Sequence, residues 1–216
     1  MTSILHARAV LLDMDGTLVD STAVVERLWL EWAEPHGIDP NIVLQTVHGR
    51  QGHQSMALLL PERDHAINLI ENQEMLARES ADVDGVVEIA GAAAFLADLH
   101  DLPHAIVTSA SVALMTARMR AAGLTVPALA ITAESVTDSK PHPEGFLAAA
   151  AQLGVGPADC VVFEDSEAGV QAGLAAGMRV IGVGAHAAAF VATHAVDDLT
   201  SVSVTADADG LRLTIG

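Results

Sequence analysis

Residues 9–15 read AVLLDMD, an apolar run that contains two aspartates at its end. Its apolar residues follow one another without polar alternation, which is typical of a strand buried on both faces of a parallel sheet. Four more runs of this kind occur along the chain: HAIVTS at 104–109, ALAIT at 128–132, CVVFED at 160–165 and RVIGVG at 179–184. The pattern therefore predicts a buried sheet whose strands are joined by longer connections.

Helix start and stop signals lie between these runs. Ser111 and Ser166 each precede a helical stretch and are predicted as N-caps, and Pro143 is predicted to open a third helix. A glycine stands near the expected end of each of these helices. Strands that alternate with helices at this spacing predict an α/β fold with a doubly wound parallel sheet.

Two segments depart from this alternation. In 22–87 the apolar residues, Trp29 and Trp32 among them, recur at helical spacing, and no convincing buried strand occurs. We predict a helical insert after the first strand, with the tryptophans in its core rather than at a ligand. The tail 202–216 alternates apolar and polar residues around Asp209–Gly210, which predicts a terminal hairpin.

The composition limits the kinds of partner. The 216 residues suffice for one large domain or for a core with a smaller insert, and 51% of them are hydrophobic. A formal net charge of −18 disfavours binding to nucleic acid or to an anionic membrane surface. The single cysteine, Cys160, is expected to be buried and suits a reducing compartment. With no apolar run of about 18 residues, a soluble cytoplasmic protein is expected. A monomer or dimer is expected as a separate matter.

Acidic residues follow two of the predicted strands. Asp13 and Asp15 end the first run, and Glu164 and Asp165 end the run at 160–165. Open α/β sheets bind ligands at the carboxyl ends of their strands, and two charges 4 Å apart repel by about 4 kcal/mol at an effective dielectric of about 20. Such a group needs a cation, and carboxylate oxygens favour Mg²⁺. The alternative is that these are ordinary turn residues.

Hydroxyl groups and one lysine follow the other strands. Thr108, Ser109 and Ser111 lie where a helix begins, and the free N–H groups of a helix start suit a phosphate group, although hydroxyls there are also common caps. Lys140 is the only lysine of the chain and follows the run at 128–132 by eight residues. It is either a surface residue or the cation of a phosphate site.

Four segments resemble, in order and spacing, the motifs of the haloacid dehalogenase superfamily: LLDMDGTLVDS, IVTSAS, SKPHPEGF and VVFEDSEAGVQAG. The resemblance covers essentially the whole chain. It implies a Rossmann-like core formed by residues 1–18 and 88–216, with a helical cap domain at 19–87. The most similar members are small phosphatases of sugar and polyol phosphates and their relative β-phosphoglucomutase.

The resemblance implies roles for the acidic residues. Asp13 would be the nucleophile that forms an aspartyl-phosphate, and Asp15 would protonate the leaving alcohol and then activate water. Mg²⁺ would be held by Asp13, by the backbone carbonyl of Asp15 and by Asp165. Glu164 is the second choice as a ligand, either directly or through water.

The resemblance also implies roles around the lysine. Thr108 and Ser109 would bind the transferring phosphoryl group, and Lys140 would neutralise charge on that group and on the nucleophile. Ser139 departs from the glycine that often precedes this lysine in the family, which affects a loop conformation. His142 and Glu144 are expected to shape the same loop.

The residues present separate the reactions of the superfamily. Haloacid dehalogenases lack an aspartate two residues after the nucleophile, so Asp15 disfavours dehalogenation. Phosphonatases and β-phosphoglucomutase use a cap lysine, but residues 19–87 contain none, and arginine cannot form a Schiff base. Hydrolysis of a small phosphate monoester is therefore predicted. A β-phosphoglucomutase-type phosphomutase and a catalytically idle binding protein remain alternatives; β-glucose 1-phosphate would yield glucose 6-phosphate only with a mutase.

The cap must supply substrate recognition, and its stretch VHGRQGHQ at 47–54 is the best candidate. Arg50 is expected to anchor a polar or anionic substrate, and His48 and His53 to bond its hydroxyls. The alternative is that all three are exposed turn residues. A cap of this size favours a small soluble phosphate ester as substrate.

Overall fold

The computed structural model describes residues 2–48, 50–190, 192–207 and 210–216. These residues form a six-stranded sheet of order β6-β5-β2-β7-β8-β9, in which every neighbouring pair is parallel. The five predicted runs supply five of its strands, which confirms the α/β fold; the short β9 was not predicted. The strands are β2 (Ala9–Leu12), β5 (His104–Val107), β6 (Ala130–Ile131), β7 (Cys160–Glu164), β8 (Arg179–Val183) and β9 (His194–Val196).

Helices cover both faces of this sheet. Leu12 of β2 belongs to a core cluster shared with Phe95 and Leu114, whereas Leu11 belongs to a second cluster shared with Phe146 and Val170. Successive residues of a strand point to opposite faces, so the two clusters lie on opposite sides of the sheet. Each fully buried leucine contributes about 1.5–3 kcal/mol. The covering helices are α5 (Ala92–Leu99) and α6 (Val112–Ala121) on one face, and α7 (Glu144–Leu153) and α8 (Glu167–Ala175) on the other.

The predicted helix starts are found in the structure. The Ser111 hydroxyl accepts a hydrogen bond from the Leu114 amide at 3.2 Å, and the Ser166 hydroxyl accepts one from the Gly169 amide at 3.1 Å. Both serines are therefore N-caps, as predicted. Helix α7 begins directly after Pro143. These caps matter for function because they lie just beyond the strand ends.

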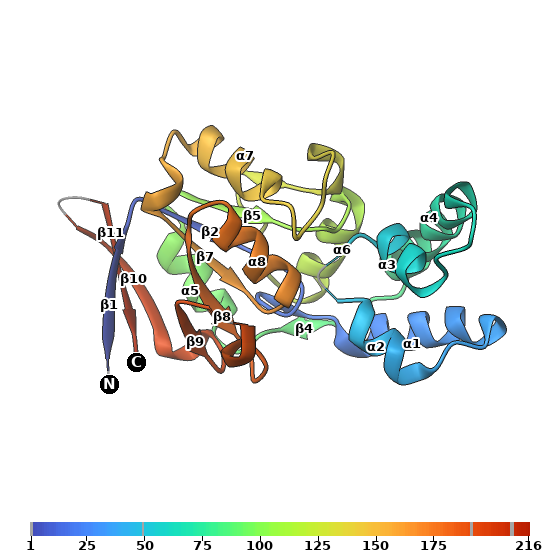
Figure 1. The fold of residues 1–216 in the computed structure, drawn as a ribbon. Coiled ribbons are helices and arrows are strands. Elements are labelled where there is room, and N and C mark those ends of the chain that lie inside the picture. The colour runs from blue at the N-terminus through green and yellow to red at the C-terminus, as the bar shows by residue number, and fades with distance from the viewer. Residues whose placement is uncertain (1, 49, 191, 208–209) are drawn as a thin grey trace.

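A helical segment, residues 22–81, lies between two short strands that pair antiparallel, β3 (Val19–Asp20) and β4 (Val87–Glu88). Figure 1 shows it at one end of the central sheet. Trp29 and Trp32 meet edge to face, with ring centroids 5.4 Å apart, and both belong to the larger core cluster, as expected, but Trp29 also lines the cavity of the candidate site. The division into a core and a cap domain stays a prediction. The helices are α1 (Thr22–Ala33), α2 (Pro40–Thr46), α3 (Gly52–Leu59) and α4 (His65–Ala81).

A second sheet lies at the opposite end of the molecule and joins the two chain ends (Figure 1). It consists of β1 (Ser3–Ala7), β11 (Gly210–Ile215) and β10 (Val202–Asp207), all antiparallel. The predicted terminal hairpin is confirmed, although Asp209 of its turn lies outside the described residues. Short 3-10 helices occupy Glu34–His36, Ala133–Ser135, Pro157–Asp159, Ala187–Phe190 and Leu199–Ser201.

Two expectations from composition concern burial and membranes. Cys160 is fully buried, as expected, and this burial raises the pKa of its thiol to about 11, so it is not a nucleophile at neutral pH. Among the described residues, no helix combines the length and the apolar character that a membrane crossing requires.

Glu71 ties the helices of the segment together, because its carboxylate accepts hydrogen bonds from the Trp32 indole and the Arg63 guanidinium, each at 2.7 Å. Arg63 holds the pKa of Glu71 below its usual value. The unfolded chain therefore binds more protons at acid pH, and the stability from this carboxylate is present above about pH 4.3 and is lost as the pH falls through the lower folded pKa.

Between pH 5 and pH 3, we expect the free energy of unfolding to fall less in Glu71→Gln than in the wild type. Urea titration with tryptophan fluorescence measures this free energy. Glu62→Gln, an exposed position nearby, is the matched control and should keep the wild-type profile. Equal profiles for the two variants would contradict this role of Glu71.

Candidate active site

The carboxyl ends of the neighbouring strands β2 and β7 bring acidic side chains together. Asp13 directly follows β2, and its amide donates to the Phe163 carbonyl of β7 at 2.9 Å, which fixes the two strand ends side by side. Carboxylate oxygens of Asp13, Glu164 and Asp165 all lie within 4.8 Å of one another. Asp13 and Glu164 are buried, at 6% and 0% exposure. Three of the four predicted carboxylates thus meet in one small volume, and Asp15 lies outside this group.

The loop between β6 and α7 brings Lys140 into this volume. Its Nζ lies 2.5 Å from Asp13 Oδ1 and 2.7 Å from Glu164 Oε1, and the residue is only 5% exposed. The Nζ also stands 5.4 Å from the centre of the Phe146 ring, which supports the side chain from α7. Lys140 is therefore not a surface residue, but the partner of two buried carboxylates.

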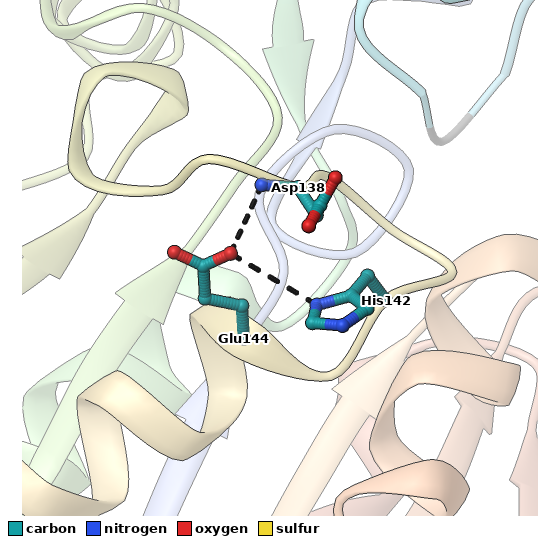
Figure 2. Close-up of side chains that lie close together, drawn as sticks. All are labelled: Asp138, His142 and Glu144. Atoms are coloured by element: carbon teal, nitrogen blue, oxygen red, sulfur yellow. Dashed lines mark hydrogen bonds and ion pairs between the residues drawn. The ribbon is translucent and has the colours of Figure 1, made fainter.

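The loop that carries Lys140 is held by Glu144. The Glu144 carboxylate accepts hydrogen bonds from the amides of Thr137 and Asp138, both at 2.9 Å. Figure 2 shows this carboxylate lying between the Asp138 backbone and the His142 ring. Because Glu144 binds backbone amides, it shapes the loop rather than the reaction centre. The Ser139 hydroxyl adds a 2.5 Å bond to Gln54 on α3, so a serine in place of glycine links the loop to the helical segment.

The charges of this group do not balance within the protein. Burial raises the pKa of Asp13 to about 7 against the opposing effect of Lys140, and burial together with Glu164 raises the pKa of Asp165 well above its usual value. Burial acts to lower the pKa of Lys140, but Asp13 and Glu164 outweigh it and raise that pKa. Three carboxylates thus share one ammonium group. A hard divalent cation fits this oxygen-rich cluster and would return the carboxylates to their ionised form.

Two glycines allow backbone to approach these carboxylates. A Cβ at position 169 would lie 1.6 Å from Glu164 Oε1, so α8 passes directly against the Glu164 side chain. A Cβ at position 16 would lie 1.9 Å from Asp165 Oδ2, and Gly16 also has a φ of +84°. Ser166 holds the other oxygen of Glu164, through its amide at 2.8 Å and its hydroxyl at 3.0 Å. Both oxygens of Glu164 therefore have protein donors.

Asp15 lies across from this cluster and is held by two donors. Its Oδ1 accepts a hydrogen bond from the Ser21 hydroxyl at 2.7 Å, and its Oδ2 accepts one from Arg118 Nη1 at 2.8 Å. Ser21 directly precedes α1, and Arg118 lies on α6. The Asp15 carboxylate is thus oriented by both the core and the start of the helical segment.

Thr108 and Ser109 follow β5, the strand next to β2 in the sheet. The Thr108 amide donates to the Ile131 carbonyl of β6 at 2.9 Å, and its hydroxyl accepts from the Ala110 amide at 3.1 Å. Helix α6 begins three residues after Ser109, with Ser111 as its cap. The two hydroxyl residues therefore border the same space as Asp13.

A cavity of about 100 Å³ connects these groups to the helical segment. The cap candidates Arg50 and His48 line it; Gly49 between them lies outside the described residues. Arg50 Nη1 donates to the Thr46 carbonyl at 3.3 Å. The His48 side chain is 41% exposed, and partial desolvation lowers the pKa of its imidazole. His53 instead packs its ring against His65, with centroids 5.7 Å apart.

Five polar residues of the cavity wall were not anticipated from the sequence: Ser21 and Thr22 at the start of α1, Asn72 and Glu79 on α4, and Arg118 on α6. Glu79 and Arg118 are 6% and 3% exposed, and a 2.9 Å ion pair joins them. The available signal was spacing. Asn72 and Glu79 lie seven residues apart, on the same helix face as the buried Met75, and Arg118 follows the buried Leu114 by one turn. Polar residues within an apolar stripe of a helix mark such a wall.

Known proteins are similar to this chain in sequence and in fold. The model of the haloacid dehalogenase-like hydrolase family matches residues 7–177. Hexitol phosphatase A of Escherichia coli K12 is 41% identical over 185 residues, which cover 85% of this chain and 86% of that protein. Glycerol-1-phosphate phosphohydrolase 2 of Saccharomyces cerevisiae is 30% identical, with 83% and 75% covered. The crystal structure of a hydrolase from Pseudomonas syringae shares the fold, with a TM-score of 0.76, 22% identity and coverage of 88% and 94%.

A methyl group added at position 169 tests how closely α8 packs against the Glu164 carboxylate. Alanine is favoured over glycine in a helix by about 1 kcal/mol, yet we expect Gly169→Ala to destabilise the protein by about 1–3 kcal/mol and to lower turnover, because its methyl group displaces the Glu164 carboxylate. Thermal unfolding and phosphatase assays measure both effects. Gly156→Ala is the control, since its Cβ meets only Asp159, at 3.7 Å. A Gly169→Ala protein as stable and active as the control would contradict the proposed crowding.

Proposed function

The chain belongs to the haloacid dehalogenase-like hydrolase family and is a phosphoric monoester hydrolase, and we propose that it hydrolyses small sugar or polyol phosphates through an aspartyl-phosphate intermediate with Mg²⁺. The observation that carries the mechanism is the buried contact of Lys140 with Asp13, a carboxylate that lines the cavity together with Asp15. A nucleophilic carboxylate, a fixed cation and a second carboxylate are the groups that this reaction requires.

In the first step an oxygen of Asp13 forms a bond to phosphorus while the bond from phosphorus to the alkyl oxygen breaks. Asp15 gives its proton to the leaving oxygen. In the second step Asp15 takes a proton from water, and the water oxygen forms a bond to phosphorus. The bond between phosphorus and the Asp13 oxygen breaks, which releases phosphate and restores the Asp13 carboxylate. The hydrogen bonds from Ser21 and Arg118 orient the Asp15 carboxylate, which lines the cavity.

Binding of the phosphoryl group falls to Thr108, Ser109 and Lys140. Thr108 and Ser109 would present their hydroxyl groups to its oxygens, and the ammonium group of Lys140 would offset the negative charge that gathers in the transition state. Asp13, the Asp15 backbone carbonyl and Asp165 would hold Mg²⁺, which supplies charge neutralisation to the phosphoryl oxygens when bound. Because both oxygens of Glu164 already have protein donors, Glu164 remains the second choice as a ligand.

The substrate proposal rests on the size of the cavity and on the relatives. A cavity of about 100 Å³ suits a small organic leaving group. The relatives are named for hexitol phosphate and glycerol 1-phosphate hydrolysis. We extend this to Arg50 and His48 as cap residues that contact the substrate, since both line the cavity. Residues 19–87 would then act as a cap that excludes water during the first step. The buried, unpaired Cys160 fits a reducing cytoplasm, where the enzyme would act as a monomer or dimer.

Metal dependence and the nucleophile are tested together with p-nitrophenyl phosphate. We expect hydrolysis with Mg²⁺, its loss in EDTA and its return when Mg²⁺ is restored. Asp13→Asn should lower kcat on the order of a thousandfold or more, because the amide cannot attack phosphorus. The exposed Asp159→Asn serves as control. Absence of turnover of any phosphate ester by the wild type would sink the proposed function.

Lys140 is tested by a substitution that keeps its charge. We expect Lys140→Arg to lower kcat by about a hundredfold or more, because the planar guanidinium is larger than the ammonium group and cannot occupy the buried point between Asp13 and Glu164. Circular dichroism should show a folded protein. Arg120→Lys exchanges the same two residue types at an exposed position and should leave kcat unchanged. Near-normal turnover by Lys140→Arg would refute the need for a compact cation.

A further inference from the structure

Arg118 is a buried cation with two acidic partners from different parts of the chain. Its Nη1 donates to Asp15 Oδ2 at 2.8 Å, and its Nη2 donates to Glu79 Oε2 at 2.9 Å. The side chain is 4% exposed and that of Glu79 is 8% exposed, and both residues line the cavity beside Asp15. Arg118 therefore stands next to the group that would protonate the leaving oxygen.

One donor of Arg118 is unused. Its Nε is buried and has no hydrogen-bond partner in the part of the chain that the structure describes. A buried N–H group without an acceptor is costly, so a ligand that shifts the cavity wall enough to offer Nε an acceptor would gain from this contact. The Nε–H group lies on the same edge of the guanidinium as Nη2, the atom that binds Glu79. The missing acceptor thus belongs beside the Glu79 carboxylate.

The two groups at this place call for one kind of ligand. Arg118 Nε can only donate, and the carboxylate of Glu79, when ionised, can only accept. A hydroxyl group both donates and accepts, so a single hydroxyl satisfies the two together. A second anionic group would instead meet the carboxylates of Glu79 and Asp15, which repel it.

We propose that Arg118 and Glu79 form a receptor for the hydroxyl on the carbon next to the phosphate ester, and that this pair selects polyhydroxy leaving groups. The inference rests on the proposed phosphatase function, with Asp15 beside the leaving oxygen. Because Arg118 bonds directly to Asp15, the hydroxyl nearest to the leaving oxygen, which is the vicinal one, is the best placed to reach this pair. Glu79 and Arg118 are then specificity-determining residues and take no part in bond breaking.

The test compares two substrates that differ in one hydroxyl. Glycerol 1-phosphate carries the vicinal hydroxyl, and propane-1,3-diol monophosphate lacks it but keeps the chain length and the terminal hydroxyl. A site built to bond a hydroxyl discriminates against the analogue without it. We expect the wild type with Mg²⁺ to prefer glycerol 1-phosphate by about tenfold or more in kcat/KM.

Two variants should reduce this preference toward one. Glu79→Gln keeps the shape of the side chain and can still accept from Arg118, but it replaces the charged acceptor. Arg118→Lys keeps the charge and removes the Nε donor. Glu74→Gln, on the exposed face of the same helix, should leave the preference unchanged. The ratio of the two substrates is the readout, because a loss of folded enzyme lowers both rates equally and cannot alter it.

The outcomes separate this inference from the proposed function. A wild type that hydrolyses p-nitrophenyl phosphate but shows no preference for the vicinal hydroxyl overturns the inference alone. So does an unchanged preference in both variants with equal losses on both substrates, which would make the pair a structural link only. A wild type that hydrolyses no phosphate ester overturns both proposals. A preference that falls in both variants and persists in Glu74→Gln supports the receptor.

Discussion

The structure depends on keeping three carboxylates together at the ends of two adjacent strands. Charges at such distances repel by several kcal/mol even at an effective dielectric of about 20, and burial removes the water that would otherwise solvate them. The ammonium group of Lys140 compensates for part of this repulsion through its contacts with Asp13 and Glu164. The remaining negative charge explains why the cluster suits a divalent cation and, through that cation, an anionic phosphate in a strongly acidic protein.

Much of the surrounding backbone accommodates this cluster. Helix α8 approaches Glu164 only because residue 169 has no side chain, and the turn after Asp15 approaches Asp165 only because residue 16 has none. Glu144 secures the loop that delivers Lys140, and Ser166 both caps α8 and binds Glu164. Capping and turn formation, which are usually local matters, here set the positions of reactive groups.

The helical segment meets the strand ends through polar contacts that span large sequence distances. Arg118 joins Glu79 of α4 to Asp15, and Ser139 joins the lysine loop to Gln54 of α3. A buried ion pair contributes little net stability, because desolvation offsets its attraction, but it specifies geometry when every partner is fixed. These contacts therefore define the shape and polarity of the cavity in which the leaving group would lie.

The sequence by itself determined the sheet, the helices between its strands and the acidic, hydroxyl and lysine residues at the strand ends. Unbroken apolar runs, serine caps and the single Lys140 are local signals that need no partner to be recognised. The short β9, the pairing of β1 with β11, and the cavity wall formed by Asn72, Glu79 and Arg118 were decided by tertiary structure. Glu79 and Arg118 are 39 residues apart, and an isolated acidic or basic residue on a helix most often faces solvent. Only packing of α4 against α6 reveals that each is buried against the other.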